Sequence, residues 1–176
     1  MRPPVHIRPA SEPDLEPINR IYNDEILHGT ATWDSEPWPI EKRRTWWLAH
    51  HDPLQPVLVA ETSGDVLGFA YLTRMSDKAG WRFTREDTIY LAPAARGRGI
   101  GRVLLAALLQ EARRLGIRTI IASITSTNTA SIRLHESFGF QPVGILRNAG
   151  YKFGRWLDTA YYQLDLGEPP PGAPTW

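Results

Sequence analysis

A glycine-rich segment stands directly before the most regular helical pattern of the chain and constrains the fold more than any other feature. Residues 96–101 read Arg-Gly-Arg-Gly-Ile-Gly, and the apolar residues after them recur at helical spacing as far as Leu115, where Gly116 supplies an expected C-terminal cap. The first amide groups of a helix lack intrahelical partners, and together with the helix dipole they favour an anion. Glycines let the backbone approach that anion, and Arg96 and Arg98 can add charged hydrogen bonds. The segment therefore predicts a phosphate-binding turn between a strand and a helix.

Two common phosphate-binding motifs do not fit this segment. A P-loop needs a lysine and a hydroxyl residue after its last glycine, but Gly101 is followed by Arg102 and Val103. The dinucleotide fingerprint begins at Gly97 and Gly99 but meets Arg102 where its third glycine belongs, and no acidic residue follows about twenty positions on. The diphosphate of another carrier is therefore expected, and a plain glycine-rich loop with surface arginines is the alternative.

Hydrophobic periodicity divides the rest of the chain into helices and strands. Helices are predicted over residues 11–29, 40–50, 100–115 and 128–138. Strands are predicted over residues 5–8, 56–61, 66–74, 86–91, 119–125, 140–146 and 156–166, with a polar loop at 75–84. This order of elements indicates an α/β (α+β mixed) fold.

Composition and charge limit the partners and the chemistry. A chain of 176 residues with 42% hydrophobic and 22% charged residues is expected to fold as one domain, residues 1–167, followed by a proline-rich flexible tail, residues 168–176. A net charge of +1 favours neither nucleic acid nor a membrane surface as the partner. Because the chain has no cysteine, a disulfide, a thiolate metal site and a cysteine acyl-enzyme are excluded. The N-terminus lacks the apolar run of a signal peptide or anchor, so a cytoplasmic location is expected.

Two motifs in order resemble those of the GCN5-related N-acetyltransferases (GNAT). The pattern Arg96-x-x-Gly99-x-Gly101 resembles the family's coenzyme A-binding signature, and residues 128–140 resemble its second motif. Residues 7–166 are most similar to the phosphinothricin and methionine sulfoximine acetyltransferase group, through Ala-Thr-Trp at 31–33, Trp-Arg at 81–82, Leu-His-Glu at 134–136 and Phe-Gly-Arg-Trp-Leu-Asp at 153–158. The resemblance implies a GNAT fold, with a central mixed twisted sheet of about six to seven strands flanked by about four helices. It also implies acetyl-CoA as the co-substrate, and no metal.

The resemblance also implies roles for individual residues. Glu86 corresponds to the family's general base, and His135 takes the position where many relatives place a tyrosine that protonates the thiolate. An imidazole can do the same or help to deprotonate the amine, and a structural role is the alternative. Asn128, Ser131 and His135 share one helix face, which is expected to meet the cofactor. Backbone amides at 89–91 are expected to polarise the thioester carbonyl, as the family's irregular strand does. The residues expected to bind acetyl-CoA are Ile89, Tyr90, Leu91, Arg96, Gly97, Arg98, Gly99, Ile100, Gly101, Asn128 and Ser131.

The expected acceptor is the amine of a small amino acid-like molecule, such as phosphinothricin or methionine sulfoximine, which attacks directly within a ternary complex. Members of the group usually carry a basic residue at the position of Ser76, so in this chain the charge for a substrate carboxylate must come from elsewhere in the loop. The residues expected to bind the acceptor are Trp33, Arg74, Lys78, Trp81 and Arg82.

Two features suit a homodimer, which the group usually forms: the seven tryptophans and the segment at 153–158. Two other functions stay open. One is a protein N-terminal acetyltransferase. The other is a non-catalytic acyl-CoA-binding module, which would keep residues 96–101 but would not need Glu86.

Overall fold

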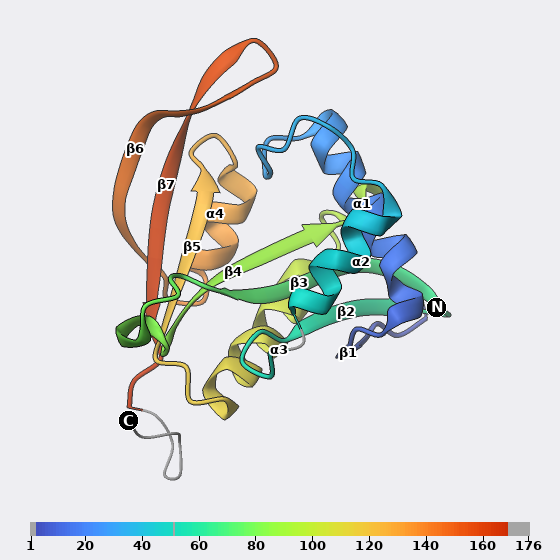
Figure 1. The fold of residues 1–176 in the computed structure, drawn as a ribbon, viewed down its shortest axis with the longest axis horizontal. Helices are drawn as coiled ribbons and strands as arrows, with labels where there is room; N and C mark the ends of the chain where they lie inside the picture. The colour runs from blue at the N-terminus through green and yellow to red at the C-terminus, as the bar shows by residue number, and fades with distance from the viewer. Residues whose placement is uncertain (1–2, 51, 169–176) are drawn as a thin grey trace.

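Seven strands form one sheet in the order β1-β2-β3-β4-β5-β7-β6 (Figure 1). The computed structural model of the chain describes residues 3–50 and 52–168. The strands are β1 (His6–Pro9), β2 (Val57–Thr62), β3 (Asp65–Arg74), β4 (Thr84–Leu91), β5 (Thr119–Thr125), β6 (Gln141–Lys152) and β7 (Arg155–Asp165). The α-helices of the described residues are α1 (Leu15–His28), α2 (Ile40–Ala49), α3 (Ile100–Arg114) and α4 (Thr129–Glu136), and the 3₁₀ turns are η1 (Glu12–Asp14), η2 (Ala79–Trp81) and η3 (Pro93–Ala95). The predicted mixed α/β fold is confirmed.

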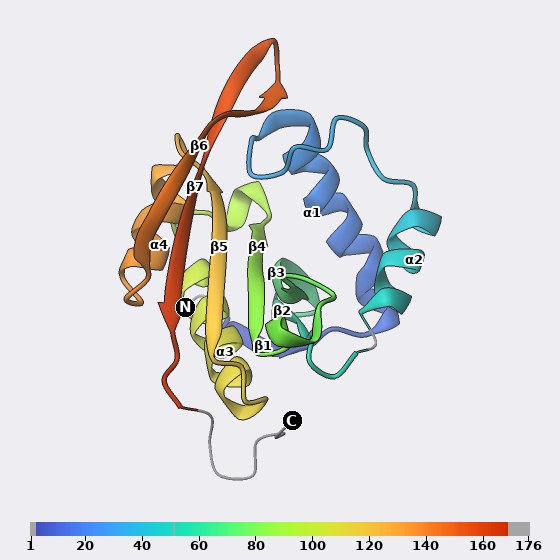
Figure 2. The same cartoon turned by 60° about the vertical axis from the view of Figure 1, so that its left-hand side comes forward.

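The sheet is mixed because β4 and β5 run parallel, whereas the other neighbouring strands are antiparallel. Parallel neighbours need a long crossover, and α3 supplies it. Helices α1 and α2 lie on one face of the sheet and α3 and α4 on the other (Figure 2). The chain is therefore layered as helices, sheet and helices.

Hydrophobic clusters on both faces hold these layers together. Along β3, Phe69 belongs to the cluster that contains Ile18 of α1, whereas Ala70 and Leu72 belong to the cluster that contains Leu104 of α3. This alternation is the period of a strand that is buried on both sides. Full burial of each large side chain stabilises the fold by about 1.5–3 kcal/mol.

Capping interactions are present before α1 and after α3, where Gly116 was the predicted cap. Before α1, the Ser11 amide donates a 2.7 Å hydrogen bond to the Asp14 carboxylate. After α3, Gly116 has a φ of 73°, the left-handed conformation that glycine adopts without strain.

The hairpin of β6 and β7 is longer than predicted. The end predicted for its first strand, residue 146, was wrong, because β6 continues to Lys152. Most of β6 is exposed, so no alternation of burial marks its length in the sequence, and pairing with β7 defines it instead. Phe153 and Gly154, with φ values of 51° and 73°, form the tight turn.

The proline-rich tail predicted at 168–176 lies outside the described residues except for Glu168, whose carboxylate accepts a 2.6 Å hydrogen bond from Arg118. Among the described helices, none is long and apolar enough to cross a membrane.

Candidate active site

The parallel strands β4 and β5 separate partway along their length. Their pairing runs from Thr84 opposite Thr119 to Asp87 opposite Ala122 and then stops. Beyond that point β4 stays paired with β3 as far as Leu91, and β5 stays paired with β7. Figure 1 shows the two arrows pointing apart. A gap therefore opens inside the sheet.

A cleft of about 1070 Å³ occupies this gap and extends to the start of α3. Its walls come from the loop after α1, from β4 and β5, from residues 96–102, from α4 and from the β6–β7 hairpin. The lining residues predicted from the sequence are Trp33, Glu86, Ile89, Tyr90, Leu91, Arg96, Gly97, Gly99, Gly101, Asn128, Ser131 and His135. The tertiary structure brings these residues, more than 100 positions apart at the extremes, into one cavity.

Two backbone amides of β4 face the gap. The Ala92 amide donates to Leu67 of β3, so the period of the ladder directs the amides of Tyr90 and Thr88 to the same side. The amides of Ile89 and Leu91 therefore point to the opposite edge, where β5 has moved away. The register of β4 with β3 is continuous, so the irregular strand implied by the resemblance is not what frees them. The separation from β5 does.

The glycine-rich turn has the backbone of a phosphate cradle. Gly97 and Gly99 have φ values of 70° and 78°, and Gly99 is the N-cap of α3. A side chain at either position would meet open space, so the backbone conformation and not crowding favours glycine there. Ile100 buries its side chain in the core, which leaves its backbone amide as the group that can face a ligand.

Three arginines surround the cradle. Arg96 pairs with Glu25 at 3.0 Å, and Arg98 donates to the backbone of the preceding turn. Arg102 lines the cleft and donates to Ser137 of the α4 C-terminus, a contact that no motif of the sequence indicated. The cradle end of the cleft is therefore its positively charged end.

Glu86 is half-buried on β4 and lines the cleft. Burial raises the pKa of its carboxyl group, and the adjacent charge of Asp87 raises it further. A carboxylate with a raised pKa accepts a proton more readily near neutrality, as a general base requires.

His135 is buried in the wall of the cleft, and its neighbour Asp87 was missed by the sequence reasoning. The imidazole Nε2 lies 3.0 Å from Oδ2 of Asp87, and Nδ1 lies 2.7 Å from the backbone oxygen of Ser131. Asn128 caps this helix, because its side-chain oxygen accepts the amide of Ser131 at 3.2 Å. Asp87 and His135 are 48 positions apart, so only the pairing of strand and helix could reveal their contact.

The loop after α1 closes over the cleft and is tied to the opposite wall. Trp33 Nε1 donates to the hydroxyl of Thr125 at 3.3 Å, and that hydroxyl donates to the Thr30 carbonyl at 2.5 Å. The indole ring packs so closely on Gly150 that a Cβ at Gly150 would collide with it. The buried ammonium of Lys152 donates to the Thr32 carbonyl at 2.7 Å. The tip of the β6–β7 hairpin thus supports the predicted wall residue Trp33.

Four residues predicted to bind the acceptor are not among the described residues that line the cleft: Arg74, Lys78, Trp81 and Arg82. Arg74 is paired with Asp52 at 2.6 Å, and the Arg82 guanidinium lies 4.6 Å from the ring centre of Phe83. Trp81 is 45% exposed. Their contact with a substrate stays a prediction.

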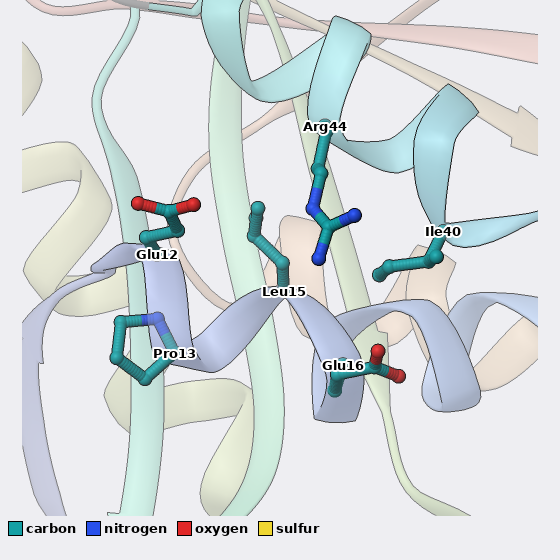
Figure 3. Close-up of a pocket in the computed structure, with 6 residues that line it drawn as sticks. All are labelled: Glu12, Pro13, Leu15, Glu16, Ile40 and Arg44. Carbon is teal, nitrogen blue, oxygen red and sulfur yellow. The ribbon is translucent and has the colours of Figure 1, made fainter.

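A second hollow, of about 290 Å³, lies between the N-terminal ends of α1 and α2 (Figure 3). The figure shows the Arg44 guanidinium reaching into it from α2, with the carboxylates of Glu12 and Glu16 at its rim. None of the predicted site residues lines this hollow. In the described part of the chain, no group of three or more histidine or acidic side chains could hold a metal ion.

Comparison with known proteins agrees with this geometry. Residues 7–161 match the family model described as an acetyltransferase (GNAT) domain. The chain is 42% identical over 162 residues to the L-methionine sulfoximine/L-methionine sulfone acetyltransferase of Salmonella typhimurium. The match covers 92% of this chain and 95% of the relative.

Solved structures give the same result. A GNAT superfamily phosphinothricin acetyltransferase from Sinorhizobium meliloti in complex with AcCoA is 38% identical with a TM-score of 0.91, over 97% of this chain and 93% of that chain. A ribosomal-protein-alanine N-acetyltransferase from Brucella melitensis is 42% identical with a TM-score of 0.89, over 92% of this chain and 99% of that chain.

A diphosphate cradle that opens into a gap with free strand amides defines a site for a phosphorylated acyl carrier. The chain belongs to the GNAT acetyltransferase family.

Proposed function

We propose that this protein is a cytoplasmic N-acetyltransferase that moves the acetyl group of acetyl-CoA to the amine of a small amino acid-like molecule. The observation that carries the proposal is the gap between β4 and β5, which has the cradle beyond Leu91 and the carboxylate of Glu86 where the gap begins. A donor and an acceptor can therefore meet beside a base.

The residues at the cradle and the gap fit acetyl-CoA. The amides at 97–101 can bind its diphosphate, with charge from Arg96, Arg98 and Arg102. An extended pantetheine arm can lie where β5 has moved away, and there it can accept hydrogen bonds from the free amides of β4. Asn128, which lines the same wall, faces the arm in this arrangement.

The chemistry is direct attack. Glu86 takes the ammonium proton of the acceptor, directly or through water, and the amide of Ile89 or Leu91 polarises the carbonyl oxygen. His135 is the candidate proton donor to the leaving sulfur. The lack of cysteine leaves no thiolate nucleophile for an acyl-enzyme.

Around Trp33, the cleft-lining residues Thr30, Thr125 and Glu86 carry no positive charge. A substrate carboxylate therefore needs a cation from outside these walls, and the loop with Arg74, Lys78 and Arg82 is the predicted source. The identity of the acceptor is therefore tested with a panel of substrates.

The test is release of coenzyme A with a matched panel: phosphinothricin, methionine sulfoximine, free amino acids, their carboxamides and short peptides. We expect turnover with free amino acid-like amines. Turnover confined to peptides would instead favour the second candidate, protein N-terminal acetylation, which the ribosomal-protein-alanine N-acetyltransferase from Brucella melitensis motivates. Uptake of acetyl-CoA without turnover of any amine would favour a binding module.

We also propose that the protein is a homodimer formed through the β6–β7 hairpin. This hairpin exposes a run of large apolar side chains: Val143 (62%), Ile145 (56%), Leu146 (52%), Tyr151 (60%), Phe153 (53%) and Trp156 (63%). Exposed apolar side chains gathered on a hairpin at the edge of a sheet are typical of an interface. We expect sedimentation to give twice the chain mass and Ile145→Lys to give the monomer, whereas Val103→Lys, a change at an exposed apolar residue of α3, should leave the dimer intact. A monomeric wild type would refute the dimer.

A further inference from the structure

Asp87 and His135 form a buried ion pair at the point where the gap in the sheet begins. Nε2 of His135 lies 3.0 Å from Oδ2 of Asp87, and the two side chains are 5% and 1% exposed. Asp87 lies opposite Ala122 in the last parallel pair of β4 and β5 before these strands separate. The ion pair therefore joins α4 to β4 at the base of the gap.

The contacts of this ion pair extend along the whole of α4. The helix has eight residues, and a helix of this length depends on tertiary contacts for its stability. Nδ1 of His135, in the last turn, lies 2.7 Å from the backbone oxygen of Ser131, one turn earlier. The Ser131 amide in turn donates to the side chain of the N-cap residue Asn128. One carboxylate of β4 thus holds a series of contacts that runs from the end of α4 to its start.

The partners of the imidazole require a proton on each ring nitrogen. A backbone carbonyl only accepts, so Nδ1 carries a proton that the Ser131 oxygen holds. An ionised carboxylate also only accepts, so a second proton lies on Nε2 toward Asp87. Burial lowers the pKa of His135, but the hydrogen bond and the charge of Asp87 outweigh this effect and raise the pKa above its ordinary value. The pair is therefore an imidazolium beside a carboxylate.

Each charge of the pair depends on the other. Phe140 packs its ring edge-on against the imidazole of His135, with the ring centroids 4.9 Å apart. Oδ1 of Asp87 is buried and has no hydrogen-bond partner among the described residues. Removal of one charge would therefore leave the other buried and unpaired, which a folded protein relieves by moving the element that carries it.

The other titratable side chains of the surrounding elements have different environments. Alternation along β4 turns Glu86 to the opposite face of the sheet, and β5 carries no titratable side chain. Arg102 of α3 and both Arg133 and Glu136 of α4 are exposed. Tyr162 of β7 donates a 3.4 Å hydrogen bond to Glu136. The response of the ion pair to pH is therefore that of its own two groups.

We propose that the ion pair of Asp87 and His135 fixes α4 against β4 and so sets the width of the gap that receives the pantetheine arm. Asp87 is thus a positioning residue for acetyl-CoA. This inference rests on the proposed function, in which the arm lies beyond Asp87 with residues of α4 along one wall. The cradle amides belong to the start of α3, which the core holds independently, so binding of the diphosphate does not depend on the pair.

This role is separate from proton donation by His135. Release of the Nδ1 proton would break the 2.7 Å contact with the Ser131 carbonyl, whereas the positioning role keeps that contact. Binding of acetyl-CoA without an acceptor transfers no proton. A binding measurement therefore reports the positioning role alone.

The first test measures the ion pair by ¹⁵N NMR titration of histidine-labelled protein, with the His135 signals assigned by their loss in His135→Gln. We expect His135 to titrate with a pKa above that of an ordinary histidine in the wild type and with a lower pKa in Asp87→Asn. The spectra need no ligand, so they can be read even if the proposed function fails. An equal pKa of His135 in the two proteins would contradict the ion pair.

The second test compares acetyl-CoA with 3′-phospho-ADP, its nucleotide half, which keeps the diphosphate and lacks the pantetheine arm. We expect Asp87→Asn to weaken acetyl-CoA binding by about three- to tenfold in calorimetry and to change 3′-phospho-ADP binding by less than about twofold. Glu136→Gln, which removes an exposed charge of the same helix, is the control and should leave both affinities unchanged. Equal weakening of both ligands, or of neither, would overturn the inference. A wild type that binds no acetyl-CoA would instead refute the proposed function, and the inference with it.

A third measurement needs no change at Asp87 and so guards against misfolding of that variant. The affinities of both ligands are measured in Glu86→Gln, in which residue 86 cannot titrate, across the pKa of His135 that the NMR titration gives. Because that pKa is raised in the folded state, the ion pair is present at low pH and is lost as pH rises. We expect the affinity for acetyl-CoA relative to 3′-phospho-ADP to fall over this range by about three- to tenfold. A constant ratio would rule out the positioning role.

Discussion

Glu25 Oε2 lies 3.0 Å from Nη2 of Arg96, although the two residues are 71 positions apart. The other carboxylate oxygen of Glu25 accepts the amide of Ala31 at 2.9 Å. The Glu25 side chain is 11% exposed and that of Arg96 is 50% exposed. One nearly buried carboxylate therefore joins the phosphate cradle to the loop that carries Trp33.

We predict that the carboxylate of Glu25 competes with a bound diphosphate for Arg96. Glu25→Gln removes the charge but keeps an oxygen that can accept the Ala31 amide. We expect acetyl-CoA to bind about two- to fivefold more tightly to this variant, the size of a weak ion pair. Calorimetry on the free enzyme measures it, with Glu25→Ala as the variant that also loses the loop contact. Weaker binding to Glu25→Gln would mean that Glu25 orients Arg96 instead of competing for it.

A negative charge at the start of α3 should exclude the diphosphate. Gly99→Asp places a carboxylate beside the cradle, so the KM for acetyl-CoA should rise by about tenfold or more. Gly99→Asn is the matched control, because it has the same shape, tolerates the left-handed backbone and carries no charge. Steady-state kinetics with varied acetyl-CoA distinguish the two variants. An unchanged KM in Gly99→Asp would show that the diphosphate binds elsewhere.

As pH rises, the activity that depends on Glu86 should increase, whereas the stability that Glu86 contributes should decrease. A general base must be ionised, so activity is lost as pH falls through its pKa, and burial places this limb above the range of an exposed glutamate. The same raised pKa means that the folded state prefers the protonated form, so the stability it contributes is present at low pH and is lost as pH rises. Glu86→Gln should therefore lower kcat at pH 7 by roughly 100-fold while the melting temperature holds or rises. Full turnover in this variant would remove Glu86 from the mechanism.

The position of the Trp33 indole ring in the wall of the cleft should depend on the absence of a side chain at Gly150. A methyl group at Gly150 collides with the indole ring, so Gly150→Ala should displace it and cost about 1–3 kcal/mol of stability. We expect the KM for the acceptor to rise more than the KM for acetyl-CoA. Gly144→Ala on the same strand meets open space and serves as the control. Equal changes in both constants would argue against Trp33 as an acceptor wall.

Local sequence patterns predicted much of this protein. The helical spacing after Gly101 and the cap at Gly116 depend on interactions between residues a few positions apart, which local sequence patterns report directly. For the same reason the helices and most strands were predicted close to their observed bounds. The exposed strand β6 was the exception, because burial on one face is what makes a strand visible in a sequence.

The tertiary structure alone decided the shape of the cleft and the partners of its charges. The gap exists because β4 and β5 separate after Asp87, a property of three-dimensional pairing that no residue pattern encodes. The contacts of Asp87 with His135 and of Glu25 with Arg96 join residues 48 and 71 positions apart. A sequence can name residues with the right chemistry, but the charge state of a buried group depends on which other group the fold places within hydrogen-bond distance.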